Sequence, residues 1–443
     1  MAGIPKLVFA GMLREKLLEQ GVKITPRRAE IIAAQILAGN PKISLPGKMT
    51  GEIKLSLTSV DADVLTARIN KFLETNVPEL IGKLQADMTP PMLGSLKKRW
   101  PAEKRLYERQ ITDFRKRLRQ RWSRGLGKLG MLIYMARDFG NQLNQDVRGK
   151  QTVQDADVID VITRLHARSC QVAEEVVVLL ESGFANGAMA RWRTMHEIAV
   201  TANFVGKQGN ACARRYKDHQ IVESYRAAKE YDALHERLGY PPIAADEFDR
   251  INKQYAHVLQ QYGQNFGGQY GWAAPDLQIK KPTFKELESD VGTDFLRGHY
   301  RMASHGVHAN PKGIFFDLGS LFPSDVLPAG PSNSGLADAG DGAARSLLSA
   351  SSSLLFLSQN LDYQVALNAM TMLVDEIGSA FLQAHRKLYK DEVKLRQEEA
   401  SARALLEEHG ITEADLDAFR VVVKTPKRRS APKKSTAKKA SRK

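Results

Sequence analysis

Three of the ten histidines in this chain lie close together, in the stretch RGHYRMASHGVHANPKG that runs from Arg297 to Gly313. Metal-free cleavage of RNA requires one group to take the proton of the 2′-hydroxyl, a second to protonate the leaving oxygen, and a cation to bind the phosphate. Arg301, His305 and His308 are residues of the right types for these roles. If the segment is helical, their spacing places the three side chains on one face, and we expect them to form a catalytic site.

Two other interpretations of these histidines remain open. His308 lies just before Asn310 and Pro311, near the expected end of the helix, where the helix dipole alone favours a histidine. A metal site built from His299, His305 and His308 would lack a cysteine or a paired carboxylate at ligand spacing. We therefore predict neither a bound metal ion nor another cofactor.

A second polar cluster lies in the stretch ARWRTMHEIAV. Its apolar residues form one helical stripe, made by Trp192, Met195, Ala199 and Ala202. Arg193, His196 and Glu197 lie beside that stripe. The spacing of Arg193 and Glu197 suits an ordinary helix-stabilising ion pair, but in an apolar helix it also suits a half-buried pair that marks a site. We expect Arg193 and Glu197 to meet His305 and His308 in one polar site.

The net charge of +15 is concentrated in two segments. Residues 97–128 contain thirteen Lys or Arg and three acids, and residues 424–443 contain ten Lys or Arg and no acid. Such basic segments are typical of proteins that bind a polyanion, so we predict a nucleic-acid partner, RNA or DNA. The residues expected to contact it are Arg115, Arg117, Arg119 and Arg121 in the first segment, and Lys427, Arg428, Arg429, Lys433 and Lys434 in the second. The alternative for the second segment is a solvated tail without a function.

The first basic segment is predicted to be a helix with one thin apolar stripe. The stripe consists of Leu106, Ile111, Phe114, Leu118 and Trp122. We expect its aromatic residues and Tyr107 to pack inward rather than to stack on bases. Gly125, Gly127 and Gly130 follow with the spacing of a dinucleotide-binding loop, but no strand precedes them, so we do not expect a dinucleotide.

The composition indicates a folded chain of two or three domains. The chain has 443 residues, of which 43% are hydrophobic and 26% charged. Two cysteines exclude a disulfide scaffold and fit a reducing compartment. No stretch approaches the roughly 20 apolar residues that cross a bilayer, and the first residues lack the pattern of a secretory signal. We expect a cytoplasmic protein without a membrane partner.

The pattern of apolar residues predicts a mainly α protein, with a helical-bundle core, a small N-terminal module and a disordered basic C-terminal tail. In the N-terminal module we expect two short helices, a strand in GEIKLSLTSV, and a helix that breaks at Pro90 and Pro91. The tail has no apolar residue larger than alanine and cannot bury surface. The expected boundaries are 1–90 for an α or α/β module, 91–150 for a basic helical connector, 151–390 for the bundle, 391–423 for a helical extension and 424–443 for the tail.

The stretches LLESGFANGAMARWRTMHEIAVTANFV and HYRMASHGVHANP resemble an uncharacterised bacterial all-α family, a domain of unknown function, over about residues 155–390. That family pairs an Arg-x-x-x-Glu helix with a later Tyr…Ser-x-x-x-His helix. The matching residues here are Arg193, Glu197, Tyr300, Ser304 and His308.

The family is similar in turn to the HEPN superfamily, helical bundles that include metal-independent ribonucleases of toxin and phage-defence systems. The HEPN signature is an arginine, four to six residues, and a histidine, which Arg301 and His308 match, although Met302 stands where asparagine is favoured. The resemblance implies catalysis by this pair, at an active site formed across a homodimer.

Two functions follow as predictions. The first is an HEPN-like ribonuclease in which His308 is the base, Arg301 binds the phosphate, and the Arg193–Glu197 pair orients them. The alternative is a non-catalytic protein that binds or senses nucleic acid and is held on it by the two basic segments.

Overall fold

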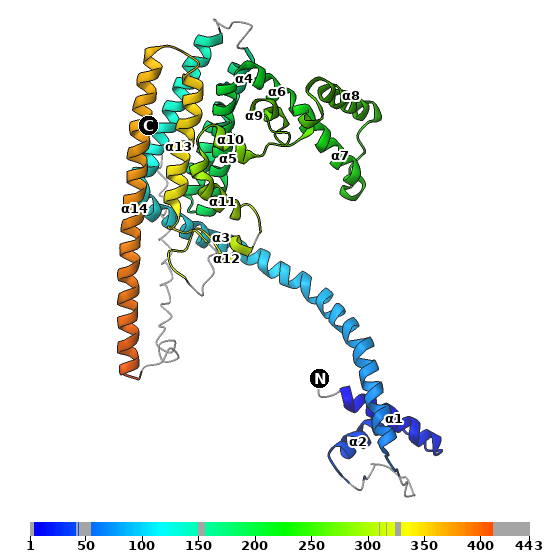
Figure 1. Cartoon of the computed structure of the whole chain (residues 1–443). Helices are drawn as coiled ribbons and strands as arrows, with labels where there is room; N and C mark the ends of the chain where they lie inside the picture. Colours follow the sequence, from blue (N-terminus) through cyan, green and yellow to red (C-terminus); the bar gives the residue numbers. More distant parts are fainter. Residues whose placement is uncertain are drawn as a thin grey trace, which may run out of the picture. The chain divides into compact units, whose positions relative to one another are not determined.

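The computed structural model describes residues 4–40, 43, 55–148, 156–309, 311–315, 317–323 and 329–410. These residues form α-helices joined by turns and short 3₁₀ helices, and none of them lies in a strand, which confirms the mainly α prediction. The chain divides into two compact units, Met1–Ile111 and Thr112–Lys443 (Figure 1). The predicted tail, 424–443, lies outside the described residues, together with Lys427, Arg428, Arg429, Lys433 and Lys434.

Unit 1 is a small helical module, as the sequence predicts. It contains α1 (Ile4–Glu19), α2 (Pro26–Leu37) and the first part of α3 (Ser59–Arg148). The N-cap of α2 is Thr25, whose side chain accepts a hydrogen bond from the backbone of Arg28 at 3.4 Å, with proline in the first position of the helix. The buried side chains of this module are Phe9, Ala10, Met12, Leu13, Leu17, Ile24, Ala29, Ile32 and Ala33.

Two expectations for this region are wrong. Residues 55–58, within the predicted strand, are not in a strand, and Ser59 already begins α3. The helix does not break at Pro90 and Pro91, because α3 continues to Arg148 with four prolines inside it. A proline inside a helix removes one backbone hydrogen bond and bends the helix at a cost of about 3 kcal/mol, but it does not end α3 at any of the four positions.

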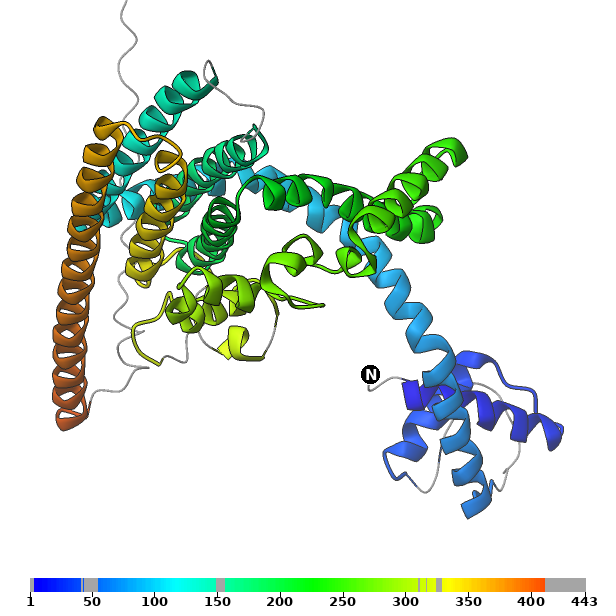
Figure 2. The ribbon, with the colours of Figure 1, turned by 45° about the horizontal axis from the view of Figure 1, so that its top comes forward.

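Unit 2 is built around a helical bundle. Its members are α4 (Ala156–Glu181), α5 (Ala185–Gln208), α13 (Leu336–Leu355), α14 (Leu361–Glu408) and residues 112–148 of α3. Helix α13 packs against α4, α5 and α14, and Figures 1 and 2 show these helices side by side. Tyr363 donates a hydrogen bond to Asp146, and Arg121 pairs with Asp391, so α3 and α14 run antiparallel. The largest fully buried side chains of this core are Trp122, Trp192, Phe204, Phe266 and Phe381.

Glycines fix two close approaches in the bundle. Gly183 has φ 81°, a left-handed conformation that reverses the chain between α4 and α5. Gly125 lies inside α3, where a Cβ would approach the ring of Phe381 to 2.9 Å. Gly127 and Gly130 also lie inside α3, so these three glycines belong to a helix interior rather than to a loop that could surround a phosphate.

The stripe of the basic helix is only partly buried. Leu118 and Trp122 are fully buried and Phe114 packs against the core of unit 2, as predicted. Leu106 and Tyr107 are exposed, so the prediction that Tyr107 packs inward is wrong. The apolar core of unit 2 includes residues of α3 only from Phe114 onward. Helix periodicity in the sequence does not show at which residue the contact with such a core begins.

The C-terminal helical region consists of two helices, α13 and α14, separated by a short turn after Leu355. By length and composition, α14 could cross a membrane, since an 18-residue window has mean hydropathy 1.3. This window is 39% buried, and a single helix of this composition is also typical of a protein core. The residues that α14 buries include Tyr363, Met370, Ile377 and Phe381.

The remaining helices of unit 2 lie against one end of α5 or beyond it. Helices α10 (Phe284–Asp290) and α11 (Arg297–His305) pack on α5, and α12 (Pro311–Phe315) follows. Between α5 and α10 lie α6 (Asn210–Asp218), α7 (Gln220–Leu238), α8 (Ala245–Tyr262), the 3₁₀ turns η1 and η2, and the short helix α9 (Ala274–Leu277). Helices α7 and α8 form a hairpin that stands apart from the bundle in both views (Figures 1 and 2).

Candidate functional site

Arg193 of α5 donates hydrogen bonds to two residues of α11. Its Nε donates to Oγ of Ser304 at 3.1 Å, and its Nη2 donates to the hydroxyl of Tyr300 at 2.6 Å. The guanidinium also lies 4.5 Å from the centre of the Tyr300 ring. Ser304 in turn donates to the backbone oxygen of Tyr300, so a single arginine fixes two successive turns of α11.

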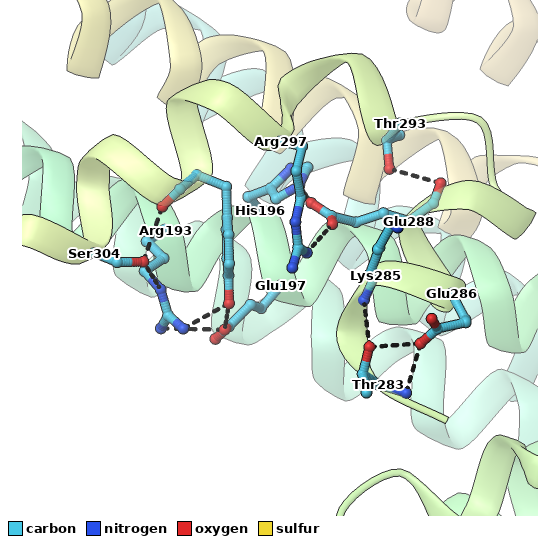
Figure 3. Close-up of polar contacts among 11 residues, drawn as sticks. Arg193, His196, Glu197, Thr283, Lys285, Glu286, Glu288, Thr293, Arg297 and Ser304 are labelled. Carbon is cyan, nitrogen blue, oxygen red and sulfur yellow. Dashed lines mark hydrogen bonds and ion pairs between the residues drawn. The ribbon is translucent and has the colours of Figure 1, made fainter. Parts of the chain in front are cut away.

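Glu197 completes this network from the next turn of α5. It accepts a hydrogen bond from the Tyr300 hydroxyl at 2.6 Å and lies 3.1 Å from Nη1 of Arg193. The Arg193–Glu197 spacing in the sequence thus produces the expected ion pair, and the pair is half-buried. Figure 3 shows Arg193, Glu197 and Ser304 grouped at the interface between α5 and α11.

A second set of charged groups lies deeper, between α5, α10 and α11. Glu288 is fully buried, and its Oε1 lies 2.9 Å from Nε2 of His196. Its other carboxylate oxygen accepts a hydrogen bond from Arg297 (Figure 3). A buried carboxylate requires such partners on both oxygens, and here they come from two different helices.

The position of Glu288 follows from the local sequence of α10. Thr283 and Glu286 form a capping box that starts the helix. From there Phe284, Leu287 and Glu288 fall on one face, and all three are buried. We did not predict a role for Glu288, although a carboxylate on the apolar face of a short amphipathic helix is the signal that could have revealed it.

Burial sets the electrostatics of these groups. Burial, together with the hydrogen bond to Glu197, raises the pKa of Tyr300, so its phenol stays protonated and donates. Burial raises the pKa of Tyr270 to about 12, and the charge of Glu197 acts in the same direction. Burial lowers the pKa of His196, against the opposing effect of Glu288. His196 is therefore a neutral imidazole that joins Trp192, Phe284 and Tyr300 in an aromatic cluster.

His305 and His308 line a cavity at the C-terminal end of α11. The cavity has a volume of about 330 Å³, and its walls include Asn186 and Met189 of α5 and Leu318 of the following loop. Helix α11 ends at His305. The backbone N–H of His308 donates to the backbone oxygen of Ser304, four residues earlier, so one further turn follows the helix end. The two imidazoles thus lie at an accessible cavity, next to the Arg193 network.

The other predicted residues of this segment lie on the surface of α11. Arg301 is exposed, one turn before His305, and is not among the residues that line the cavity. His299 is exposed as well. Because His308 lies beyond the helix, the helical spacing places only Arg301 and His305 on a common face.

The predicted nucleic-acid residues of α3 differ in their surroundings. Arg119 pairs with Glu181 and Arg121 pairs with Asp391. Arg115 and Arg117 are exposed. The ion pairs join α3 to α4 and α14, so Arg119 and Arg121 contribute to the packing of the bundle.

Within the described residues, no group of three or more His, Cys, Asp or Glu side chains is arranged to hold a metal ion. Both cysteines are buried and free. Burial raises the pKa of the Cys170 thiol to about 12 and also raises that of Cys212, which makes both thiols unreactive.

Residues 159–321 match a family of unknown function, DUF5677. The match includes α4 from residue 159, α5, α10 and α11, and therefore both polar clusters and the histidines of the cavity. It is shorter than the resemblance expected from the sequence, which extends to about residue 390. Comparisons with curated proteins and with solved structures give no match.

Proposed function

We propose that this chain is a metal-independent ribonuclease whose active site lies at the C-terminal end of α11. The observation that carries the proposal is that His305 and His308 line the same cavity. Two imidazoles at one cavity supply the proton acceptor and the proton donor that RNA cleavage requires. Arg301, exposed on the preceding turn, supplies the cation for the phosphate.

In this reaction His308 takes the proton of an RNA 2′-hydroxyl, and the 2′-oxygen attacks the adjacent phosphorus. The bond from phosphorus to the 5′-oxygen breaks, and His305 gives that oxygen a proton. The products are a 2′,3′-cyclic phosphate and a 5′-hydroxyl end. Arg301 binds the non-bridging oxygens of the phosphate, where negative charge increases in the transition state.

Arg193 and Glu197 act as positioning residues in this proposal. Through Tyr300 and Ser304 they hold α11 against α5. His305 ends that helix and His308 follows three residues later. The spacing of Arg301 and His308 resembles the HEPN signature. We therefore propose, from this resemblance, a role in phage defence or in a toxin system, with the chain acting as a homodimer. The proposed location is the cytoplasm.

The test is incubation of the full chain with end-labelled single-stranded RNA in the presence of a chelator. The unchanged chain should cut the RNA, and H308A and H305A should each lose most of this activity with melting temperatures close to that of the unchanged chain. The matched control is H299A, which removes an exposed histidine of the same helix that does not line the cavity.

The role of the 2′-hydroxyl is tested by changing the RNA substrate and by identifying the ends of the products. RNA with a 2′-deoxy sugar at the cleaved position should remain intact, and the products of normal RNA should have cyclic phosphate ends. Equal cleavage by H305A, H308A and the unchanged chain would reject this site. Cleavage by none of the three would reject the ribonuclease.

The exposed Arg115 and Arg117 favour a second candidate, a protein that binds nucleic acid without cutting it. In that case the double variant R115E/R117E and deletion of residues 424–443 should each weaken RNA binding and reduce its dependence on salt. Binding that is unchanged in both variants would reject the two basic segments as the contact surface.

A further inference from the structure

The cavity beside His305 and His308 has apolar walls that the cleavage chemistry does not require. Met189 of α5, Met302 of α11 and Ile314 of α12 line it together with the two histidines. Met189 is 2% exposed and Ile314 is 66% exposed, so the cavity has a buried side and an open rim. Proton transfer and phosphate binding use polar groups, so these walls suit another part of the substrate.

The size and the lining of the cavity indicate which part that is. Its volume of about 330 Å³ lies at the lower end of the range of roughly 300–1,000 Å³ that is typical of sites for small molecules. It therefore suits one nucleotide unit rather than several. Of the groups in an RNA strand, the base is the one with flat, largely apolar faces, and the thioether of methionine packs well against an aromatic ring.

Asn186 gives this apolar cavity a polar group of fixed orientation. It lines the cavity, its Nδ2 donates to Oδ1 of Asp317 at 2.6 Å, and its Oδ1 accepts from the backbone N–H of Leu318 at 3.4 Å. A carboxylate accepts and a backbone N–H donates, so these contacts define which end of the amide is the nitrogen. Neither contact uses the second N–H of Nδ2 or the second lone pair of Oδ1. A donor beside an acceptor is complementary to the edge of a nucleobase.

We propose that this cavity binds the base of the nucleotide whose 2′-hydroxyl attacks the phosphorus, and that Asn186 hydrogen-bonds to the edge of that base. The base is bonded to the ribose carbon next to the one that carries the 2′-hydroxyl. A nucleotide whose hydroxyl reaches His308 therefore has its base beside the walls of the cavity. In a duplex the base is stacked and paired, so the cavity takes only an unpaired base. This proposal rests on the ribonuclease proposed above and specifies which part of the substrate the chain recognises.

The first test measures binding rather than cleavage, so its result does not depend on the ribonuclease. Calorimetry with the full chain compares the four nucleoside 3′-phosphates with ribose 3-phosphate, which has the same sugar and phosphate but no base. The nucleotides should bind at least about ten-fold more tightly. M302W, which fills the cavity, should lose this difference. The matched control is H299W, which adds the same ring at an exposed position of α11 that does not line the cavity, and it should keep the difference.

The second test uses the unchanged chain and alters only the RNA. The position of the cleaved bond in an oligonucleotide is mapped first. One substrate then lacks the base on the 5′ side of that bond but keeps the 2′-hydroxyl, and the matched substrate lacks the base on the 3′ side. The first should be cut with kcat/KM lower by about ten-fold or more, and the second with kcat/KM lower by less than about two-fold. The same RNA paired with a complementary strand should not be cut.

The outcomes separate the base site from the ribonuclease. Equal binding of the nucleotides and of ribose 3-phosphate would overturn the base site alone, and so would equal cleavage of the two abasic substrates or cleavage of the duplex. A preference for nucleotides that M302W retains would also overturn it, because the base would then lie elsewhere. Preferential binding by a chain that cuts no RNA would reject the ribonuclease and retain the base site. If M302W does not fold, the comparisons on the unchanged chain still decide between these outcomes.

Discussion

Nε2 of His196 lies 2.9 Å from Oε1 of Glu288, and both side chains are buried. His196 belongs to α5 and Glu288 to α10, and the second oxygen of the same carboxylate binds Arg297 of α11. A single buried acid thus joins α5, α10 and α11.

Replacing Glu288 with glutamine should lower the free energy of unfolding by about 3 kcal/mol, because removal of one partner leaves the charge of Arg297 without compensation in a mostly buried position. Denaturant unfolding measures this loss. The matched control is E247Q, which alters an exposed ion pair with Arg250 and should change stability by about 0.5 kcal/mol or less. An equally small effect of E288Q would contradict the importance of this contact.

Stability should decrease as the pH falls from about 6.5 to about 4, in part because of His166. Burial lowers the pKa of His166 from 6.5 to about 4, so in this range the unfolded chain binds a proton that the folded chain does not. The contribution of one such histidine reaches about 1.4 kcal/mol per pH unit. His196 and His219, whose pKa values burial also lowers, act in the same direction.

The variant H166Q isolates this effect, since glutamine does not titrate and its side chain can still contact Ser351, which lies 3.2 Å from the imidazole. Unfolding at pH 7 and pH 5 should show a smaller loss on acidification for H166Q than for the unchanged chain. The same loss in both would show that His166 is accessible to protons in the folded state.

The hydroxyl of Tyr300 joins Arg193 to Glu197, so Y300F should lower the free energy of unfolding by about 1–3 kcal/mol, the contribution of hydrogen bonds to charged groups. Thermal unfolding measures the change, with Y134F as the control because Tyr134 is 71% exposed. If His305 at the end of α11 and His308 just beyond it are catalytic, Y300F should also reduce RNA cleavage. Full stability in Y300F would mean that the network does not fix α11.

Two glycines of α3 should respond to alanine in opposite ways. Gly127 lies within the helix with no neighbour in reach of an added Cβ, so G127A should raise the free energy of unfolding by about 0.5–1 kcal/mol. At Gly125 the added Cβ would lie 2.9 Å from the ring of Phe381, and G125A should lower it by about 1–3 kcal/mol. Denaturant unfolding of both variants compares them directly, and equal signs would contradict the packing of α3 on α14.

The sequence by itself determined the features that depend on neighbours along the chain. Thr25 and Pro26 start α2, Gly183 separates α4 from α5, and the spacing of Arg193 and Glu197 produces their ion pair, because capping, turns and contacts one turn apart are local. The mainly α fold follows from the same periodicity.

Only the tertiary structure decided which polar groups meet across helices. Arg193 and Glu197 bind Tyr300 and Ser304, whereas His305 and His308 line the cavity beyond the end of α11. Glu288 becomes a central residue because α10 places it between His196 and Arg297. These contacts depend on how separate helices pack and on what that packing buries, and a period of 3.6 residues specifies the face of a helix but not its partner.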